Sequence, residues 1–401
     1  MGGILYLLKQ LFSHLCLGLK SRYKWLIILF IIWLYRVDFM PDEGVGFAKI
    51  LQVVSIFGIL FFILNNTRGL TSKIVSKSNA PIKSLVWLYI YAVISVCWAY
   101  SPTFAFFLSF QNLVMILLLF YTFCLCRTFV DMERVFLLAG ISIVLFEIIT
   151  YRVLVETYLF IHFLPAASSS ALLFSYCIAE LLAMRKSDNN RSKLLIGVLI
   201  VSLITLVTST SSGANASAFA GFGLALLLSG KILISLLCIV FAAVMYANPD
   251  LIQSLILFIM PGKTMQSIET ATGRTVMWDL ILAKAAERPL IGWGFACAER
   301  SIGTQFIGVV TSDAHNNFIG IYGSLGIIGI ILFVIHWIQQ LFNAFRHRYK
   351  PGMLGLFCAT FCALLNSYSY GFLSGKACSI TIVYFSVVIL SYFYCRCKNT
   401  L

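Results

Sequence analysis

A polar stretch at 270–326 holds the residues whose types and spacing best suit phosphate chemistry. Arg274 precedes Trp278 by four positions, so the two side chains are expected on one face of a helix. A guanidinium group can grip a phosphate through two parallel hydrogen bonds. An ordinary surface ion pair with Glu269 or Asp279 would account for Arg274 equally well. These residues alone leave both interpretations open.

His315 is placed where it could act as a general base. It follows Asp313, a residue type favoured at N-cap positions, and precedes the apolar run 318–335. We therefore expect His315 in the first turn of a transmembrane helix, at the outer end, where backbone N–H groups form an anion site and the helix dipole favours neutral imidazole. A neutral imidazole can accept the proton of an alcohol, and Asn316 and Asn317 add amide donors to this turn. An interfacial histidine that only forms hydrogen bonds is the commoner alternative.

Arg288 stands just before a turn that contains Gly292 and Gly294. Glycines of this kind let the backbone approach a ligand closely, so Arg288 could be a second phosphate contact. It could equally cap the C-terminus of the preceding helix, which we expect over 275–287 and which Pro289 should end. The glycine pair is too short for a nucleotide-binding fingerprint and the chain has no Walker motif, so nucleotide-driven chemistry is not supported.

The elements that must position these residues are membrane spans. Hydrophobic residues make up 60% and charged residues 11% of the 401-residue chain, and the mean hydropathy is +0.95. Soluble proteins average about 25% charged residues, so the composition predicts an all-α, polytopic membrane protein. Roughly twelve segments suit spans of about 20 residues: 25–40, 46–64, 84–100, 104–125, 134–151, 165–184, 194–209, 213–230, 232–248, 315–340, 352–370 and 376–394. No cleavage pattern precedes the first, which is expected to remain uncleaved.

The basic residues predict the orientation of these spans. If both termini are cytoplasmic, 20 of the 29 Lys and Arg residues lie in or beside inner loops, as the positive-inside rule requires. The one long loop, 249–314, then faces outward, and its acids nearly balance its bases. The net charge of +14 is thus a topology signal, and a nucleic-acid partner is not expected.

The remaining polar residues of the apolar segments have unremarkable explanations. The 12 cysteines lack metal-binding spacing and are interpreted as buried packing residues, so neither a metal site nor a disulfide framework is expected. Glu147, Glu180 and His336 are explained by snorkelling at span edges or by bonds between helices.

Several motifs together resemble those of the O-antigen ligase and polymerase superfamily of bacterial envelopes. They are Gly273-Arg274 with Trp278, the Pro289-x-x-Gly-x-Gly-Phe turn, Asp313-x-His315-Asn316 followed by Phe318 to Gly329, and, more weakly, Trp98-x-x-Ser101-Pro102. The resemblance covers roughly 195–335. It implies N-terminal transmembrane helices in 1–194, an O-antigen ligase-like core in 195–340, and C-terminal transmembrane helices in 341–401.

The resemblance implies a membrane glycosyltransferase of the GT-C-type architecture in the bacterial inner membrane. Such an enzyme takes a glycan from undecaprenyl diphosphate on the periplasmic side and transfers it to a glycan acceptor, without a metal or other cofactor and with inversion. The family's functional Arg and His map onto Arg274 and His315. A second family Arg, in a Ser-Arg-Gly-Ala pattern, is replaced by Ser212 here, and Arg288 and Arg300 are the candidates to substitute for it.

Three functions follow from these observations. The first is a polymerase that joins lipid-linked repeat units, which the absence of an Arg at position 212 slightly favours. Its partners could include a chain-length regulator or a flippase. An O-antigen ligase that transfers finished glycan to lipid A core shares the donor and the site. A flippase or secondary transporter suits twelve spans, but transporters favour inverted repeats and broken helices at the membrane midplane. This sequence shows one dominant outer loop and no charged residue in the middle of a span.

Overall fold

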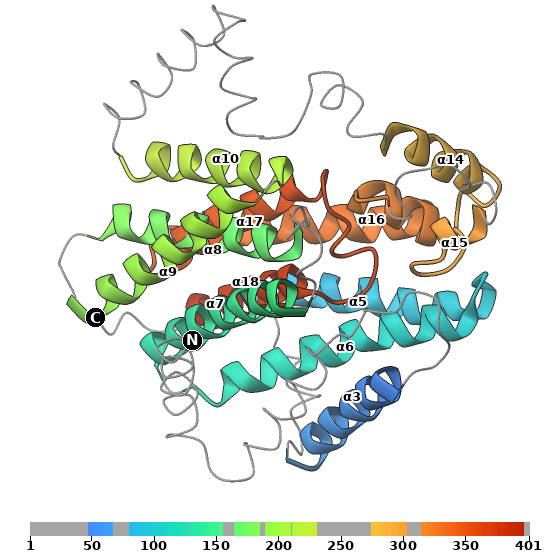
Figure 1. The fold of residues 1–401 in the computed structure, drawn as a ribbon, viewed down its shortest axis with the longest axis horizontal. Coiled ribbons are helices and arrows are strands. Elements are labelled where there is room, and N and C mark those ends of the chain that lie inside the picture. Colours follow the sequence, from blue (N-terminus) through green and yellow to red (C-terminus); the bar gives the residue numbers. More distant parts are fainter. Residues whose placement is uncertain are drawn as a thin grey trace, which may run out of the picture. The chain divides into compact units, whose positions relative to one another are not determined.

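The computed structural model describes residues 47–66, 80–126, 128–154, 164–184, 189–209, 211–230, 274–302 and 314–396. Over these residues all regular secondary structure is helical (Figure 1), which confirms the predicted all-α class. The chain forms two compact units, Met1–Ile74 and Val75–Leu401. Helix α3 (Phe47–Asn66) belongs to the first unit, and everything below concerns the second.

The helices of the second unit follow the predicted spans closely. In chain order they are α5 (Ala80–Ile94) with the 3-10 helix η1 (Ser95–Trp98), α6 (Pro102–Cys124), α7 (Phe129–Leu154), α8 (Leu164–Ala183), α9 (Asn189–Thr208), α10 (Ser212–Leu228), α14 (Arg274–Ala286), α15 (Ala298–Ile302), α16 (Asn317–Arg346), α17 (Met353–Asn366) and α18 (Ser379–Arg396). Five elements of the described chain are long and apolar enough to cross a membrane: α5 with η1, α6, α8, α9 and α16. The predicted spans 25–40 and 232–248 lie outside the described residues.

Helix α8 is the centre of the bundle because its side chains are small. Residues 166–173 are all buried, and most of them are alanine or serine. Glycines on three neighbouring helices abut it: Gly140 of α7, Gly221 of α10 and Gly355 of α17 would each bring a Cβ within 3 Å of an α8 side chain. Small residues of this kind let helices approach closely where apolar burial alone gives no preference for a partner.

The cysteines only partly follow their prediction. Five of the nine described cysteines are buried, whereas Cys97 and Cys124 are exposed. Burial raises the pKa of the Cys297 thiol, so this side chain stays protonated at neutral pH and acts as an apolar packing group. Among the described residues, no three His, Cys, Asp or Glu side chains are grouped so that they could hold a metal ion.

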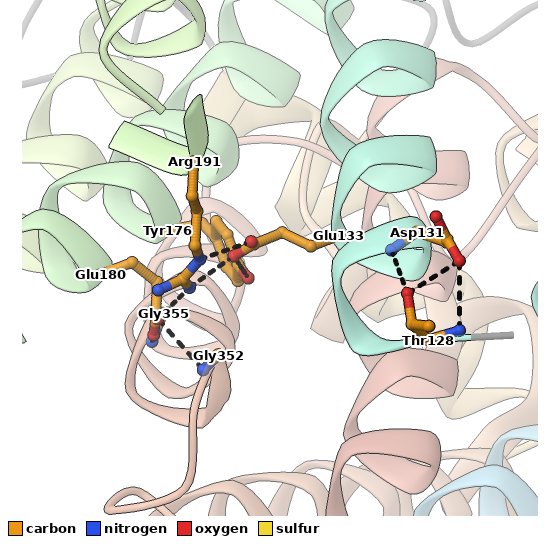
Figure 2. Close-up of polar contacts among 8 residues, drawn as sticks. All are labelled: Thr128, Asp131, Glu133, Tyr176, Glu180, Arg191, Gly352 and Gly355. Carbon is orange, nitrogen blue, oxygen red and sulfur yellow. Dashed lines mark hydrogen bonds and ion pairs between the residues drawn. The ribbon is translucent and has the colours of Figure 1, made fainter. Parts of the chain in front are cut away.

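A buried ion-pair network joins α7, α8 and α9 (Figure 2). The Arg191 guanidinium donates to both carboxylate oxygens of Glu133, at 2.6 and 2.7 Å, and to Glu180 Oε2 at 2.7 Å. Tyr176 donates its hydroxyl to Glu133 Oε1 at 2.7 Å. We call these four residues the Arg191 clasp. Glu180, one of the acids assigned to span edges, therefore forms bonds between helices rather than reaching for solvent.

The clasp also holds the start of α17. Glu180 accepts the backbone N–H groups of Gly352 at 3.0 Å and Gly355 at 2.9 Å, so its charge lies at a helix N-terminus, where a carboxylate is stabilised. Nearby, Thr128 and Asp131 cap the start of α7 reciprocally: Asp131 N–H donates to Thr128 Oγ1, and Thr128 N–H donates to Asp131 Oδ2 (Figure 2).

Helix α16 is broken rather than continuous. Gly326 has φ +66° and ψ −161°, outside the helical region. In a straight helix Phe318 and Phe333 would be about 22 Å apart, but their ring centroids are 5.1 Å apart. The short segment 317–325 therefore folds back along 327–346. The latter is long enough, at about 30 Å, to form a span by itself.

This break corrects the prediction of one uninterrupted span at 315–340. Hydropathy shows where apolar residues lie but not where the backbone turns back. Because 317–325 runs back along the span, its first residue lies near the level of Phe333, roughly 10 Å below Gly326 along the helix axis. The start of α16 therefore lies inside the helix bundle, below the end of the span at Gly326.

The turn 289–294 satisfies the backbone at this break. Four backbone hydrogen bonds join them: Trp293 N–H to Gly323 O (3.1 Å), Gly294 N–H to Ser324 O (2.8 Å), Ile327 N–H to Pro289 O (2.8 Å) and Ile328 N–H to Leu290 O (3.3 Å). Within a bilayer, broken helices are tolerated only where such partners replace the lost intrahelical bonds. The close backbone approach that Gly292 and Gly294 permit is thus used, in this structure, to dock the turn on α16.

We expect Gly326→Ala to lower the free energy of unfolding by about 3 kcal/mol, because alanine is strained at this φ. Its Cβ would also lie 2.4 Å from the Leu290 carbonyl carbon. Gly197→Ala on α9 is the matched control, since no atom lies within 4 Å of the added Cβ, and it should change stability by less than about 1 kcal/mol. Chemical unfolding of the detergent-purified protein measures both. Equal stability of the two variants would show that the break is not required.

Candidate functional site

Asn316 caps the start of α16. Its Oδ1 accepts the backbone N–H groups of Phe318 at 2.9 Å and Ile319 at 3.2 Å. His315 therefore precedes the cap, with φ +46°, and does not lie in the first helical turn. The predicted cap residue, Asp313, lies outside the described residues. Asn is as good a cap as Asp and is closer to the apolar run, which explains why the helix starts later than expected.

The expected anion site on the first turn of α16 is also corrected. Two of its N–H groups are used by Asn316, and Asn317 N–H donates to Ser367 O at 2.8 Å. A ligand would have to compete with these internal acceptors. These N–H groups are therefore not available as an anion site by themselves, and binding an anion beside His315 would need a cationic side chain from another helix.

Arg274 brings a cation to the segment that follows α17. Its Nη1 donates to the carbonyl oxygen of Ser369 at 2.9 Å. The next residue, Tyr370, stacks on His315 with the ring centroids 6.2 Å apart and the planes at 27°. Arg274 and His315, both half-buried, thus contact adjacent residues of one segment, 367–374, which we call the 367–374 loop. The structure brings the two predicted catalytic residues together.

Trp278 joins α14 to the same place. Its Nε1 donates to Ala314 O at 2.7 Å, next to His315. Arg274 lies one turn before Trp278. The first turn of α14 therefore contacts the 367–374 loop, and its second turn contacts the segment 314–316 that contains His315. The apolar face of α14, with Met277 and Ile281, packs with Ala298 and Ile302 of α15 and with Ala314.

The start of α10 lies against the same loop. A Cβ at Gly213 would overlap the Ser369 side chain, so the backbone at the start of α10 packs directly against this side chain. Ser211 is the N-cap, and its hydroxyl accepts Ala214 N–H at 3.4 Å. Ser212, where the resemblance leads us to expect a second Arg, precedes Gly213 and so lies one residue from this contact.

Arg288 and Arg300 lie away from this cluster. Arg274 and Arg288 are separated by the length of α14, about 18 Å along its axis. Arg288 donates to Trp98 O at 3.3 Å and lies 4.0 Å from the Trp293 ring centroid. The Arg300 guanidinium lies 3.7 Å from the ring centroid of Phe104. Both side chains are exposed and contact residues at the junction of α5 and α6, so their substitution for the missing Arg stays a prediction.

Sequence reasoning missed the 367–374 loop. The span predicted at 352–370 ran through it, whereas α17 ends at Asn366. The polar run from Asn366 to Ser369 was the available signal, because such residues rarely continue an apolar helix.

The fold and this cluster define a multi-pass, all-α membrane protein with a basic and an imidazole side chain at one polar site. Residues 197–334 match a family model described as O-antigen ligase. This confirms the resemblance that the motifs predicted, and the matched segment contains Ser212, Arg274 and His315. No curated protein matches the chain.

Proposed function

We propose that the protein is an inner-membrane glycosyltransferase that takes a glycan from undecaprenyl diphosphate on the periplasmic side. The observation that supports this most is the convergence of Arg274 and His315 on the 367–374 loop. The family match to O-antigen ligase gives the reaction class. The glycan acceptor would be a second sugar chain with a free hydroxyl.

The chemistry needs few groups. Arg274 would stabilise the charge that develops on the departing diphosphate, as preorganised cations do in other transferases. His315 would accept the proton of the acceptor hydroxyl while its oxygen bonds to the anomeric carbon and the bond from that carbon to the diphosphate oxygen breaks. Attack opposite the leaving group inverts the anomeric centre. Undecaprenyl diphosphate leaves, and no step requires a metal.

Among acceptors, we favour the growing end of another lipid-linked glycan, which makes the protein a polymerase of O-antigen, capsule or exopolysaccharide units. Ser212 supports this choice over an O-antigen ligase, because the family Arg is absent there. A deletion strain decides between them. A polymerase defect leaves single repeats on lipopolysaccharide, whereas a ligase defect leaves bare core and accumulated lipid-linked polymer.

The broken α16 is also a feature of secondary transporters. In those proteins unwound carbonyl groups coordinate the transported ion. Here Gly323 O and Ser324 O accept hydrogen bonds from the turn 289–294, and Leu325 O accepts the Tyr91 hydroxyl at 3.4 Å. These acceptors are therefore already used, which favours transfer over transport.

The direct test reconstitutes the purified full-length protein with undecaprenyl-diphosphate-linked repeat units. A polymerase releases undecaprenyl diphosphate and forms chains of increasing length, which a gel separates. Movement of unchanged donor across the vesicle membrane, without bond formation, would instead identify a flippase.

A further inference from the structure

Asn317 is fully buried, and its side chain forms hydrogen bonds within the protein. Its amide is therefore already used and does not serve as the donor to a ligand that the sequence predicted. Its Oδ1 accepts the backbone N–H groups of Leu373 at 2.7 Å and Ser374 at 3.1 Å. Its Nδ2 donates to Ser367 Oγ at 3.0 Å, and its backbone N–H donates to Ser367 O. The side chain therefore binds both ends of the 367–374 loop.

The residues between those two ends touch the proposed catalytic pair. Ser369 accepts from Arg274 through its carbonyl group, and Tyr370 stacks on His315. Asn317 itself follows His315 by two positions. The Asn317 amide thus fixes the 367–374 loop relative to the start of α16. Arg274 and His315 both contact this loop.

We propose that Asn317 is a positioning residue of this site, an inference that rests on the proposed glycosyltransferase function. It acts through the 367–374 loop and does not touch the substrate. Without the three hydrogen bonds of its side chain the two ends of the loop can separate, and the Arg274 and His315 side chains are no longer held against one fixed segment. Misplacement of reacting groups by about 1 Å can cost roughly 100-fold in rate.

Gln340 provides a matched control on the same helix. It is also fully buried and also joins two other elements, donating to Thr360 Oγ1 at 3.2 Å and accepting from Ser391 Oγ at 3.2 Å. It lies 23 positions after Asn317, in the span segment of α16. Asn317→Ala and Gln340→Ala should therefore lower thermal stability to similar extents.

The test measures chain extension per folded molecule, with undecaprenyl-diphosphate-linked repeat units as the probe. Asn317→Ala is expected to lower kcat by roughly 100-fold, whereas Gln340→Ala keeps the parent rate. Equal rates for the two variants would overturn the proposal and show that Asn317 only stabilises the fold.

A milder pair keeps the proposal testable if Asn317→Ala does not fold. Ser367→Ala removes one bond to Asn317, and Thr360→Ala removes the corresponding bond to Gln340. Ser367→Ala should lower kcat and Thr360→Ala should not; a parent rate for Ser367→Ala would contradict the proposal. The parent protein separates the two inferences: if it forms no chains from undecaprenyl-diphosphate-linked repeat units, the proposed function itself is refuted, whereas a normal parent rate together with a parent-like rate for Asn317→Ala refutes only the positioning role.

Discussion

Alanine at His315 or at Arg274 is expected to lower the rate of glycan transfer by roughly 100-fold or more. Loss of His315 removes the acceptor for the hydroxyl proton, and loss of Arg274 leaves the developing diphosphate charge without its cation. Both variants should keep a thermal stability close to that of the parent protein, because each side chain is only half-buried, while their transfer rate falls. The measurement is the glycan ladder made by purified protein, normalised to folded molecules.

Two residues at the far end of α16 control for the removal of an imidazole and a guanidinium. His347 donates its Nδ1–H to the backbone carbonyl oxygen of Asn343 at 2.9 Å, and the Arg348 guanidinium donates to Phe345 O and to the Tyr349 hydroxyl. His347→Ala and Arg348→Ala should leave the ladder unchanged. A full ladder from His315→Ala and Arg274→Ala would exclude both from the chemistry.

Arg191→Ala is expected to destabilise the protein by about 3–5 kcal/mol, because it leaves two buried carboxylates without their cation. The side chains of Glu133 and Glu180 are 2% and 4% exposed, so water cannot replace the guanidinium. The clasp lies at the end of the bundle that the basic residues assign to the cytoplasm. Its loss should separate α7, α8, α9 and α17 there, and the yield of folded protein from membranes should fall.

Neutralising the acids tests whether charge is the cause. Glu133→Gln with Glu180→Gln in the Arg191→Ala background should recover much of the lost stability, since uncharged amides are far cheaper to bury. The exposed pair of Lys284 and Glu287, at 2.8 Å, serves as a control, and Lys284→Ala should cost less than about 1 kcal/mol. If Arg191→Ala is as mild as Lys284→Ala, the clasp is not a stabilising element.

The helices could be predicted from the sequence because hydropathy is a property of single segments. Predicted spans such as 104–125 and 165–184 match α6 and α8 to within a few residues. The break in α16 could not be predicted, because Gly326 turns the chain only with the turn 289–294 docked on it. That turn is 32 or more positions earlier, and no local signal joins the two.

The same limit applies to the site. Arg274, Trp278 and His315 could be selected because their residue types and the polar stretch around them are unusual in an apolar chain. Their common partner, the 367–374 loop, was partly included in the predicted span 352–370, because the polar run from Asn366 to Ser369 is short and follows a long apolar run. Arg288 could be interpreted from the sequence as a second phosphate contact or as a cap of the preceding helix, and α14 separates it from Arg274 by about 18 Å along the helix axis.

The most direct test of the account is photocrosslinking of the purified full-length protein with undecaprenyl diphosphate that carries a photoreactive group beside the diphosphate. Mass spectrometry then identifies the labelled peptides. We expect label in the 367–374 loop and at the starts of α10 and α14, and less label in Arg274→Ala. Label confined to the Arg191 end of the bundle, or unchanged in Arg274→Ala, would contradict it.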